Sequence, residues 1–229
     1  MRPFNTYFDH TLLKPDATTE DIKKLCDEAK KYCFYSVCVN SSYVKLAYDQ
    51  LTGSGTKVTA VAGFPLGAMD SLAKAYEANI ACENGAEEID MVINVGALKE
   101  GRDKYVASDI SKVKSVCYDH DVILKVILET CLLTDDEIVR VCKLAENAGA
   151  EFIKTSTGFA SAPNGSSGGA TVHDVQLIRR SVSDHIRIKA SGGIHTLAQA
   201  NALIEAGAGR LGCSASVSIM EEYLDYLTR

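Results

Sequence analysis

Short apolar segments alternate with amphipathic segments along the whole chain. The apolar segments are rich in β-branched residues and end in polar turns, which predicts the buried strands of a parallel sheet. The segments between them repeat apolar residues at helical spacing behind threonines that can cap a helix, as in residues 19–29 and 134–138. The expected strands are residues 7–11, 36–40, 57–62, 88–94, 123–128, 152–156, 187–190 and 210–213.

Glycines mark several of the expected helix ends. Gly85, Gly149 and Gly207 each stand between a helical segment and the next strand, where a left-handed residue commonly closes a helix. Eight strands alternating with eight helices predict a closed (β/α)8 barrel, with residues 1–229 as one domain and the chemistry at the carboxyl ends of the strands. An open, doubly wound α/β sheet is the alternative. Such sheets usually have fewer strands and a nucleotide-binding glycine motif, which this chain lacks.

Composition narrows the function classes. A chain of 229 residues can bury one large core, and its net charge of -6 argues against nucleic acid as a partner. The 8 cysteines lie mostly in apolar segments and no secretory leader precedes them, so we expect reduced thiols in the cytoplasm. Neither a Cys-x-x-Cys pair nor a His-Glu-x-x-His motif is present, and no metal is expected. No apolar run is long enough to cross a bilayer, so no membrane is expected as a partner.

Lysines interrupt three consecutive apolar strands. Lys154 lies in Phe152-Ile153-Lys154-Thr155-Ser156, and Lys125 and Lys189 have similar neighbours. Burial lowers the pKa of an amine and can convert an inert cation into a nucleophile that forms a Schiff base with a carbonyl. The alternative for each lysine is an apolar stem that carries the charge out to solvent.

Strand geometry places further groups near these amines. Lys154 and Ser156 share one face of their strand, and Lys189 on the next strand is close enough to lower the pKa of Lys154 further. Asp90 interrupts its strand in the same way, so that it can serve either as a counter-ion or in proton transfer through a bound water. Glu129, at the end of the Lys125 strand, is expected to neutralise Lys125.

Glycines follow the last two expected strands. Gly192 and Gly193 follow the seventh, and the stretch from Gly212 to Ser214 closes the eighth, where such barrels often bind phosphate through loop amides and a helix N-terminus. A Gly-Gly pair by itself is also common in turns. The glycine- and serine-rich segment 160–169 is expected to be a mobile loop over the site.

Three other features have simpler interpretations. Residues 63–67, Gly-Phe-Pro-Leu-Gly, are expected to shape the barrel rim rather than to touch substrate. His10 has the chemistry for acid–base work, but a core histidine with satisfied hydrogen bonds is the more common outcome. Cys38 is most often just a buried apolar thiol in such a position.

Taken together, these motifs resemble the deoxyribose-phosphate aldolase family over nearly the full chain. The matching segments are residues 8–15, 63–67, 88–94, 124–130, 154–159 and 189–194, in this order and spacing. The resemblance implies a metal-independent, cofactor-free class I aldolase that reversibly cleaves 2-deoxy-D-ribose 5-phosphate into D-glyceraldehyde 3-phosphate and acetaldehyde. Its partners would be these small molecules.

The resemblance also implies residue roles. Lys154 becomes the Schiff-base lysine, Asp90 the proton donor and acceptor, and Lys189 the second catalytic lysine that tunes Lys154. Lys125 and Cys38 become supporting residues. The implied substrate and phosphate contacts are Gly158, Gly192, Gly193, Gly212 and Ser214.

The chain departs from the family in two places. Ala215 follows Ser214 where the family often has a second serine or a glycine, so a second hydroxyl contact to phosphate is in doubt. Some members end in a tyrosine that reaches the site, whereas here Tyr223 and Tyr226 precede a different end, and neither is assigned a role.

Two rival functions stay open. One is a different Schiff-base barrel, such as a transaldolase-like lyase that accepts another donor. The other is a catalytically idle barrel that binds a sugar phosphate for regulation. Barrels of this size often associate, so a homodimer or homotetramer is expected as an alternative to a monomer.

Overall fold

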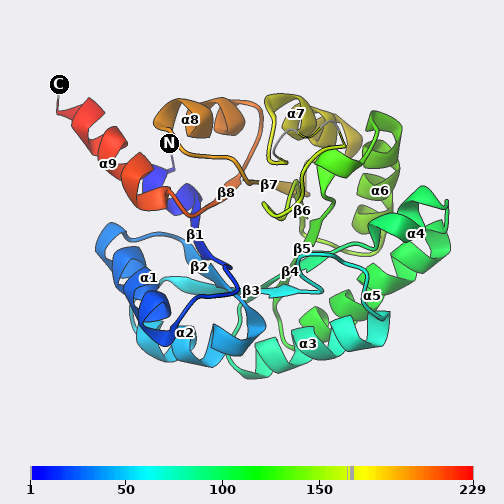
Figure 1. The fold of residues 1–229 in the computed structure, drawn as a ribbon, viewed down its shortest axis with the longest axis horizontal. Helices are drawn as coiled ribbons and strands as arrows, with labels where there is room; N and C mark the ends of the chain where they lie inside the picture. The colour runs from blue at the N-terminus through cyan, green and yellow to red at the C-terminus, as the bar shows by residue number, and fades with distance from the viewer. Residues whose placement is uncertain (1, 164, 166–167, 229) are drawn as a thin grey trace.

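The computed structural model describes residues 2–163, 165 and 168–228. Within them, parallel strands close into a barrel in the order β1 to β8, and helices surround it (Figure 1). The strands are β1 Phe8–Leu12, β2 Ser36–Val39, β3 Lys57–Ala62, β4 Glu88–Val92, β5 Ile123–Ile127, β6 Phe152–Lys154, β7 Arg187–Ser191 and β8 Arg210–Cys213. The predicted (β/α)8 barrel is confirmed, and the open sheet is excluded.

The helices lie between consecutive strands and after the last one. They are α1 Thr19–Tyr32, α2 Val44–Leu51, α3 Ser71–Glu83, α4 Val95–Lys99, α5 Asp103–Asp119, α6 Asp135–Asn147, α7 Val172–Ser181, α8 Leu197–Glu205 and α9 Ser216–Leu227. Short 3-10 helices span Phe4–Tyr7, Ser41–Tyr43 and Thr130–Leu132. The short helix α4 was not predicted. Asn94 caps this helix by accepting a hydrogen bond from the amide of Ala97, so a helix begins where the predicted strand was expected to end.

Local signals in the sequence explain many helix ends. Thr18 and Thr134 cap α1 and α6, each in a reciprocal capping box. Gly85, Gly149 and Gly207 adopt positive φ after α3, α6 and α8, as expected for residues that close a helix.

Several predicted strand ends differ from the structure by one or two residues. Tyr7 ends a 3-10 helix, so β1 begins one residue later than expected. The sixth strand was expected to reach Ser156 but ends at Lys154. Beyond Lys154 the backbone still bonds to β7, because the amide of Thr155 donates to the carbonyl of Lys189 at 3.1 Å.

The main core lies between the outer faces of the strands and the surrounding helices. Strand residues such as Ile89 and Val126 pack there with helix residues such as Ile110 and Val141, all of them buried. The C-terminal helix α9 lies beside the N-terminal segment (Figure 1), where the rings of Tyr223 and Phe4 are 4.4 Å apart.

A buried lysine fixes the segment that follows β3. Lys74 on α3 pairs with Asp109 on α5 at 2.6 Å and donates to the carbonyls of Gly67 and Val92. Gly67 itself has no room for a side chain, because a Cβ there would lie 1.9 Å from the carbonyl oxygen of Ile93. Residues 63–67 are therefore held at the carboxyl end of β4, on the barrel rim as predicted.

Candidate active site

The inner faces of neighbouring strands carry charged residues at matching heights. Lys154 on β6 lies opposite Lys189 on β7, and Asp90 on β4 lies opposite Lys125 on β5. Side chains alternate between the two faces of a strand, so these four residues point into the barrel while their neighbours join the outer core. The predicted convergence of the lysines is confirmed.

Asp90 is the common partner of the three lysines. One of its oxygens, Oδ1, accepts from Lys125 at 2.7 Å. The other, Oδ2, accepts from Lys154 at 2.8 Å and from Lys189 at 2.7 Å. Lys125 and Lys189 have no exposed surface and Lys154 is 2% exposed, so none of them extends its charge to solvent. The alternative of solvated lysines is excluded.

The pKa values of Lys154 and Lys189 are shifted in opposite directions. Burial lowers the pKa of Lys154, and the nearby positive charge of Lys189 lowers it further, against the opposing attraction of Asp90. Burial also acts on Lys189, but Asp9 and Asp90 outweigh it and raise the pKa of Lys189. Of this pair, Lys154 is therefore the amine that more readily gives up its proton.

The carboxylate beneath these amines stays ionised. Burial by itself would raise the pKa of Asp90, but the ammonium groups of Lys125, Lys154 and Lys189 outweigh it and hold this pKa well below its ordinary value. The charges around Asp90 therefore keep its carboxyl group ionised.

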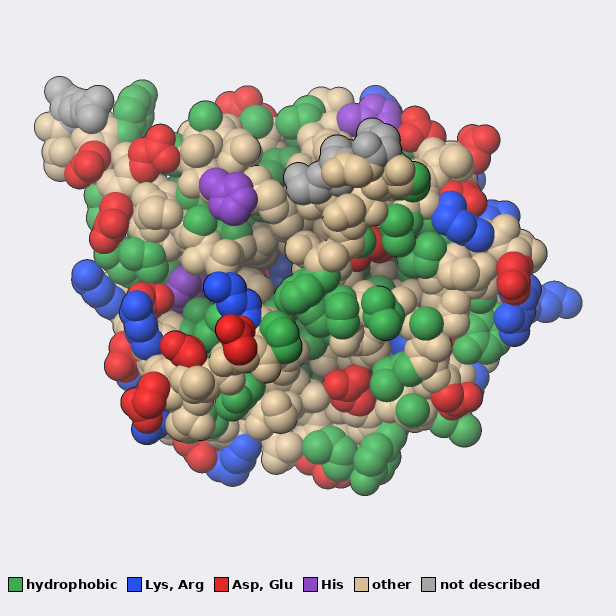
Figure 2. All heavy atoms as spheres, viewed as in Figure 1, with side chains coloured by type: hydrophobic (Ala, Val, Ile, Leu, Met, Phe, Trp, Pro, Cys, Tyr) green, Lys and Arg blue, Asp and Glu red, His purple; other side chains and the backbone are tan. Residues whose placement is uncertain are grey.

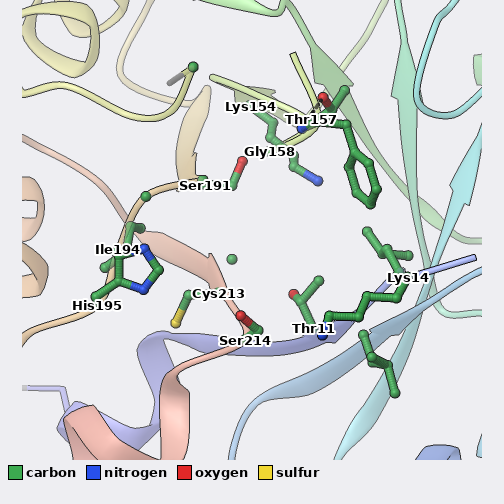
Figure 3. A pocket seen from close by; sticks show the side chains of 17 residues that line it. Thr11, Lys14, Lys154, Thr157, Gly158, Ser191, Ile194, His195, Cys213 and Ser214 are labelled. Carbon is green, nitrogen blue, oxygen red and sulfur yellow. Dashed lines mark hydrogen bonds between the residues drawn. The ribbon is translucent and has the colours of Figure 1, made fainter. Parts of the chain in front are cut away.

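A cavity of about 470 Å³ opens above Lys154 at the carboxyl ends of the strands. Figure 3 shows the Lys154 amine directed into it, with Thr11 and Lys14 on the opposite side and Ser191, His195 and Ser214 closing the remaining wall. The space-filling view shows apolar side chains gathered near the centre of this face and charged side chains spread around it (Figure 2). Asp90, Lys189, Lys125 and Cys38 are buried beneath the cavity and do not line it.

All the predicted substrate-binding residues line this cavity, namely Gly158, Gly192, Gly193, Gly212 and Ser214. Gly158, Gly192 and Gly193 have positive φ values, which turn their backbones at the cavity wall. At Gly212 the constraint is space rather than backbone conformation, because a Cβ there would lie 2.8 Å from Cε of Lys189. Ser214 precedes α9, whose first turn receives no side-chain cap. The amide groups of this first turn are thus available to an anion.

The cavity has a basic lining. Lys14, Lys154 and His195 contribute basic side chains, and no aspartate or glutamate is among the described residues that line it. Lys14 and His195 are exposed. In a protein of net charge -6, this is a local site suited to an anionic substrate.

One predicted ion pair is wrong. Glu129 does not contact Lys125; it accepts hydrogen bonds from the backbone and hydroxyl of Thr157. Glu129 itself adopts a left-handed conformation after β5, which ends the strand alternation on which the prediction relied. Lys125 pairs instead with Glu88 at 2.6 Å, in addition to Asp90.

His10 and Cys38 lie outside the cavity. His10 faces α1, where its Nε2 lies 2.8 Å from Glu28, and burial lowers its pKa. It therefore lies among core residues as expected, but its Nδ1 is buried with no hydrogen-bond partner among the described residues, so its hydrogen bonds are not all satisfied. Cys38 is buried against Leu13 and Val61 on the inner side of the barrel, and burial raises the pKa of its thiol. Each of the 8 cysteines is a free thiol.

The loop predicted over the site is described only in part. Residues 164, 166 and 167 lie outside the described residues. Gly168 lines the cavity, and the amide of Ala170 donates to the carbonyl of Gly192 at 3.1 Å. The far end of this segment is thus joined to the cavity wall, while its mobility stays a prediction.

Several residues of the site were not predicted to be functional. Lys14, Thr11 and His195 line the cavity, while Asp9, Glu88 and Arg210 lie beneath it. The same alternation that singled out Asp90 also applies to Glu88, two residues earlier on the same strand. Strand alternation could therefore have predicted that Glu88 points into the barrel.

The described residues, with 164, 166 and 167 left aside, contain no cluster of His, Cys, Asp and Glu suited to a metal ion. In the same part of the chain, no helix has the length and apolar character needed to cross a membrane.

Comparison with known proteins places this chain in a family. The chain is 54% identical over 219 residues to a deoxyribose-phosphate aldolase of Alkaliphilus oremlandii, covering 96% of each, and 54% identical over 217 residues to one of Lactococcus lactis, covering 95% of each. The solved deoxyribose phosphate aldolase of Aeropyrum pernix superposes with a TM-score of 0.89 at 29% identity, over 97% of this chain and 92% of that one. Residues 5–219 match the family model described as DeoC/LacD family aldolase. The resemblance noted from the motifs is therefore confirmed, and the chain belongs to the DeoC/LacD aldolase family.

Proposed function

We propose that the protein cleaves 2-deoxy-D-ribose 5-phosphate reversibly into D-glyceraldehyde 3-phosphate and acetaldehyde, with Lys154 as the Schiff-base nucleophile. The observation that carries this proposal is the buried amine of Lys154 at the base of a basic cavity, bonded to an ionised carboxylate. The identity to relatives of that name supports the substrate.

In this mechanism, the neutral amine of Lys154 attacks the C1 aldehyde of the open-chain sugar. Loss of water gives an iminium, which accepts the electron pair of the C2–C3 bond as the C3 hydroxyl loses its proton and becomes an aldehyde. Protonation of the enamine at C2 and hydrolysis then release acetaldehyde and restore the amine.

Asp90 and Lys189 are proposed to move the protons. Asp90 accepts a hydrogen bond from Lys154 itself, so it is placed to take the proton that the amine sheds. Neither Asp90 nor Lys189 lines the cavity, so transfer to the C3 hydroxyl and the enamine carbon would pass through a bound water. Lys125 would hold Asp90 from below, at 2.7 Å, and Cys38 would pack beside them.

The phosphate is proposed to bind between the β7 and β8 loops. Gly158, Gly192 and Gly193 would offer backbone amides, together with Ser214 and the uncapped N-terminus of α9. Gly212 lines the same wall, although its main role would be to leave room for Lys189.

Incubation of the purified protein with 2-deoxyribose 5-phosphate tests this function directly. Equal amounts of glyceraldehyde 3-phosphate and acetaldehyde are expected. Turnover only with a ketone donor would favour a transaldolase-like lyase. Tight binding of the sugar phosphate without turnover would favour an idle regulatory barrel.

Lys14 offers a test of the phosphate site. It is exposed at the cavity wall, reaches across from the end of β1 (Figure 3), and has no ion-pair partner among the described residues. Lys14→Met should raise KM for 2-deoxyribose 5-phosphate about tenfold, because a charge-assisted hydrogen bond contributes about 1.5–3 kcal/mol. Lys24→Met, outside this cavity, is the matched control. Equal effects of Lys14→Met on unphosphorylated 2-deoxyribose would show that Lys14 does not act on the phosphate.

We also propose that the protein acts in the cytoplasm and associates with itself. Large apolar side chains are exposed on α3 and α5, among them Leu72, Tyr76 and Tyr118, and the Aeropyrum pernix relative is described as tetrameric. Light scattering after gel filtration should give the mass of a homodimer or homotetramer. A monomer at micromolar concentration would contradict the association.

A further inference from the structure

A cluster of ion pairs fills the barrel beneath the cavity. It contains the cations Lys125, Lys154, Lys189 and Arg210 and the carboxylates Asp9, Glu88 and Asp90, each of them at most 2% exposed. Four cations face three carboxylates, so the cluster carries one excess positive charge when every lysine is protonated. Loss of one proton balances the charges. Lys154, whose pKa is lowered, can lose it more readily than Lys189, whose pKa is raised.

The lower half of this cluster is built around Arg210. Its guanidinium pairs with Asp9 at 2.6 Å and with Glu88 at 3.2 Å, and it stacks on the ring of Tyr35 with Cζ 3.5 Å from the centroid. Asp9 in turn contacts Lys189, at 2.5 Å, and Glu88 contacts Lys125 at 2.6 Å. Both lysines then reach Asp90, which binds Lys154. Arg210 is thus connected to Lys154 through two continuous chains of ion pairs.

Resting on the proposed role of Lys154 as nucleophile, we propose that Arg210 and Glu88 are positioning residues whose opposite charges on the barrel floor set how readily Lys154 gives up its proton. Neither residue lines the cavity or contacts Lys154. They act at a distance through the field inside the barrel, where low solvent exposure leaves charges weakly screened.

Other titratable groups also face Lys154. They are Asp90, Lys189 and Lys125, Asp9 below them, the thiol of Cys38 and the carboxyl of Glu129, while Lys14 and His195 share its cavity. Glu129 is bonded to Thr157 and makes no ion pair with the cluster. The variants leave these residues in the sequence but remove an ion pair of Asp9 or of Lys125. Because Arg210→Met and Glu88→Gln remove opposite charges, shifts of opposite sign are what identifies an effect of charge.

The test is the pH dependence of kcat/KM for cleavage of 2-deoxyribose 5-phosphate in a charge cycle of variants. The acid limb of this profile reports the loss of active, neutral Lys154. Removal of a positive charge favours the protonated amine, so Arg210→Met should move the acid limb to higher pH by on the order of one unit. Removal of a negative charge does the opposite, so Glu88→Gln should move the limb to lower pH. The double variant should return it close to the wild-type position.

Two controls make the cycle decisive. Arg210→Lys keeps the positive charge, so the acid limb of its pH profile should stay at the wild-type pH. If Arg210→Met does not fold, Arg210→Lys and Glu88→Gln together still test the proposal. A purely structural role would lower kcat/KM by the same factor at every pH and make the double variant worse than either single one. That result, or shifts in the same direction for both charges, would overturn the proposal. Borohydride trapping of the wild-type protein is performed first. An adduct on Lys154 there supports the proposed function, so that a failure of the charge cycle afterwards concerns only the roles of Arg210 and Glu88.

Discussion

Lys154→Met is expected to lose at least about 10⁴-fold in kcat/KM and all imine formation, while the protein stays folded. The other amine beside Lys154, on Lys189, lies beneath the cavity and its pKa is raised rather than lowered. It can therefore not replace Lys154 as the nucleophile. Methionine retains the length and the apolar stem of the lysine side chain.

The fold should tolerate this change. Asp90 keeps its ion pairs with Lys125 and Lys189, so no carboxylate is left buried without a partner. Circular dichroism and thermal unfolding check the fold, and a cleavage assay checks activity. Lys14→Met, which changes another lysine of the same cavity, should still form the imine. Full activity in Lys154→Met would refute the assignment of the nucleophile.

Asp90→Asn is expected to separate imine formation from carbon–carbon cleavage. Without the Asp90 charge, the attraction that favours protonated Lys154 is lost, so the amine should remain neutral and still trap the substrate. The proton acceptor is lost, however, and kcat should fall by about 10²–10⁴-fold. Single-turnover measurements of adduct formation and of acetaldehyde release distinguish the two steps. Loss of both steps in equal measure would contradict the proton-transfer role.

The same substitution should change stability with pH. The pKa of Asp90 is depressed in the folded protein, so its contribution is fully present above the unfolded-state value of about 4 and is lost as pH falls below it. Asp90→Asn should be less stable by about 3–5 kcal/mol at neutral pH, because the buried ammonium groups of Lys125 and Lys189 lose a shared partner. Its acid-induced loss of stability should be smaller than that of the wild type. Urea unfolding at neutral and acidic pH measures both.

The alternation of strand residues predicted a large part of this site. It identified Lys125, Lys154, Lys189 and Asp90 as residues of one barrel interior, because charged residues in short apolar strands must find partners there. The register of neighbouring strands then placed Lys154 beside Lys189. Both conclusions needed only the period of a strand and the order of strands in a closed barrel.

The partners of individual charges could not be predicted in this way. Glu129 was expected to pair with Lys125, but the left-handed turn after β5 directs it to Thr157, and Glu88 takes its place. Arg210 meets Asp9, far away in sequence, only because β8 closes against β1. Lys14 reaches the cavity from a loop whose course no strand or helix pattern specifies. These contacts depend on tertiary geometry.

The proposed mechanism requires Lys154 to form a Schiff base with the sugar phosphate. The most direct measurement is incubation with 2-deoxyribose 5-phosphate and borohydride, followed by peptide mass spectrometry of the reduced adduct. We predict one covalent adduct on the peptide that contains Lys154, and none in Lys154→Met. An adduct on Lys14 or Lys189 instead, or no adduct on the folded protein, would contradict the claim.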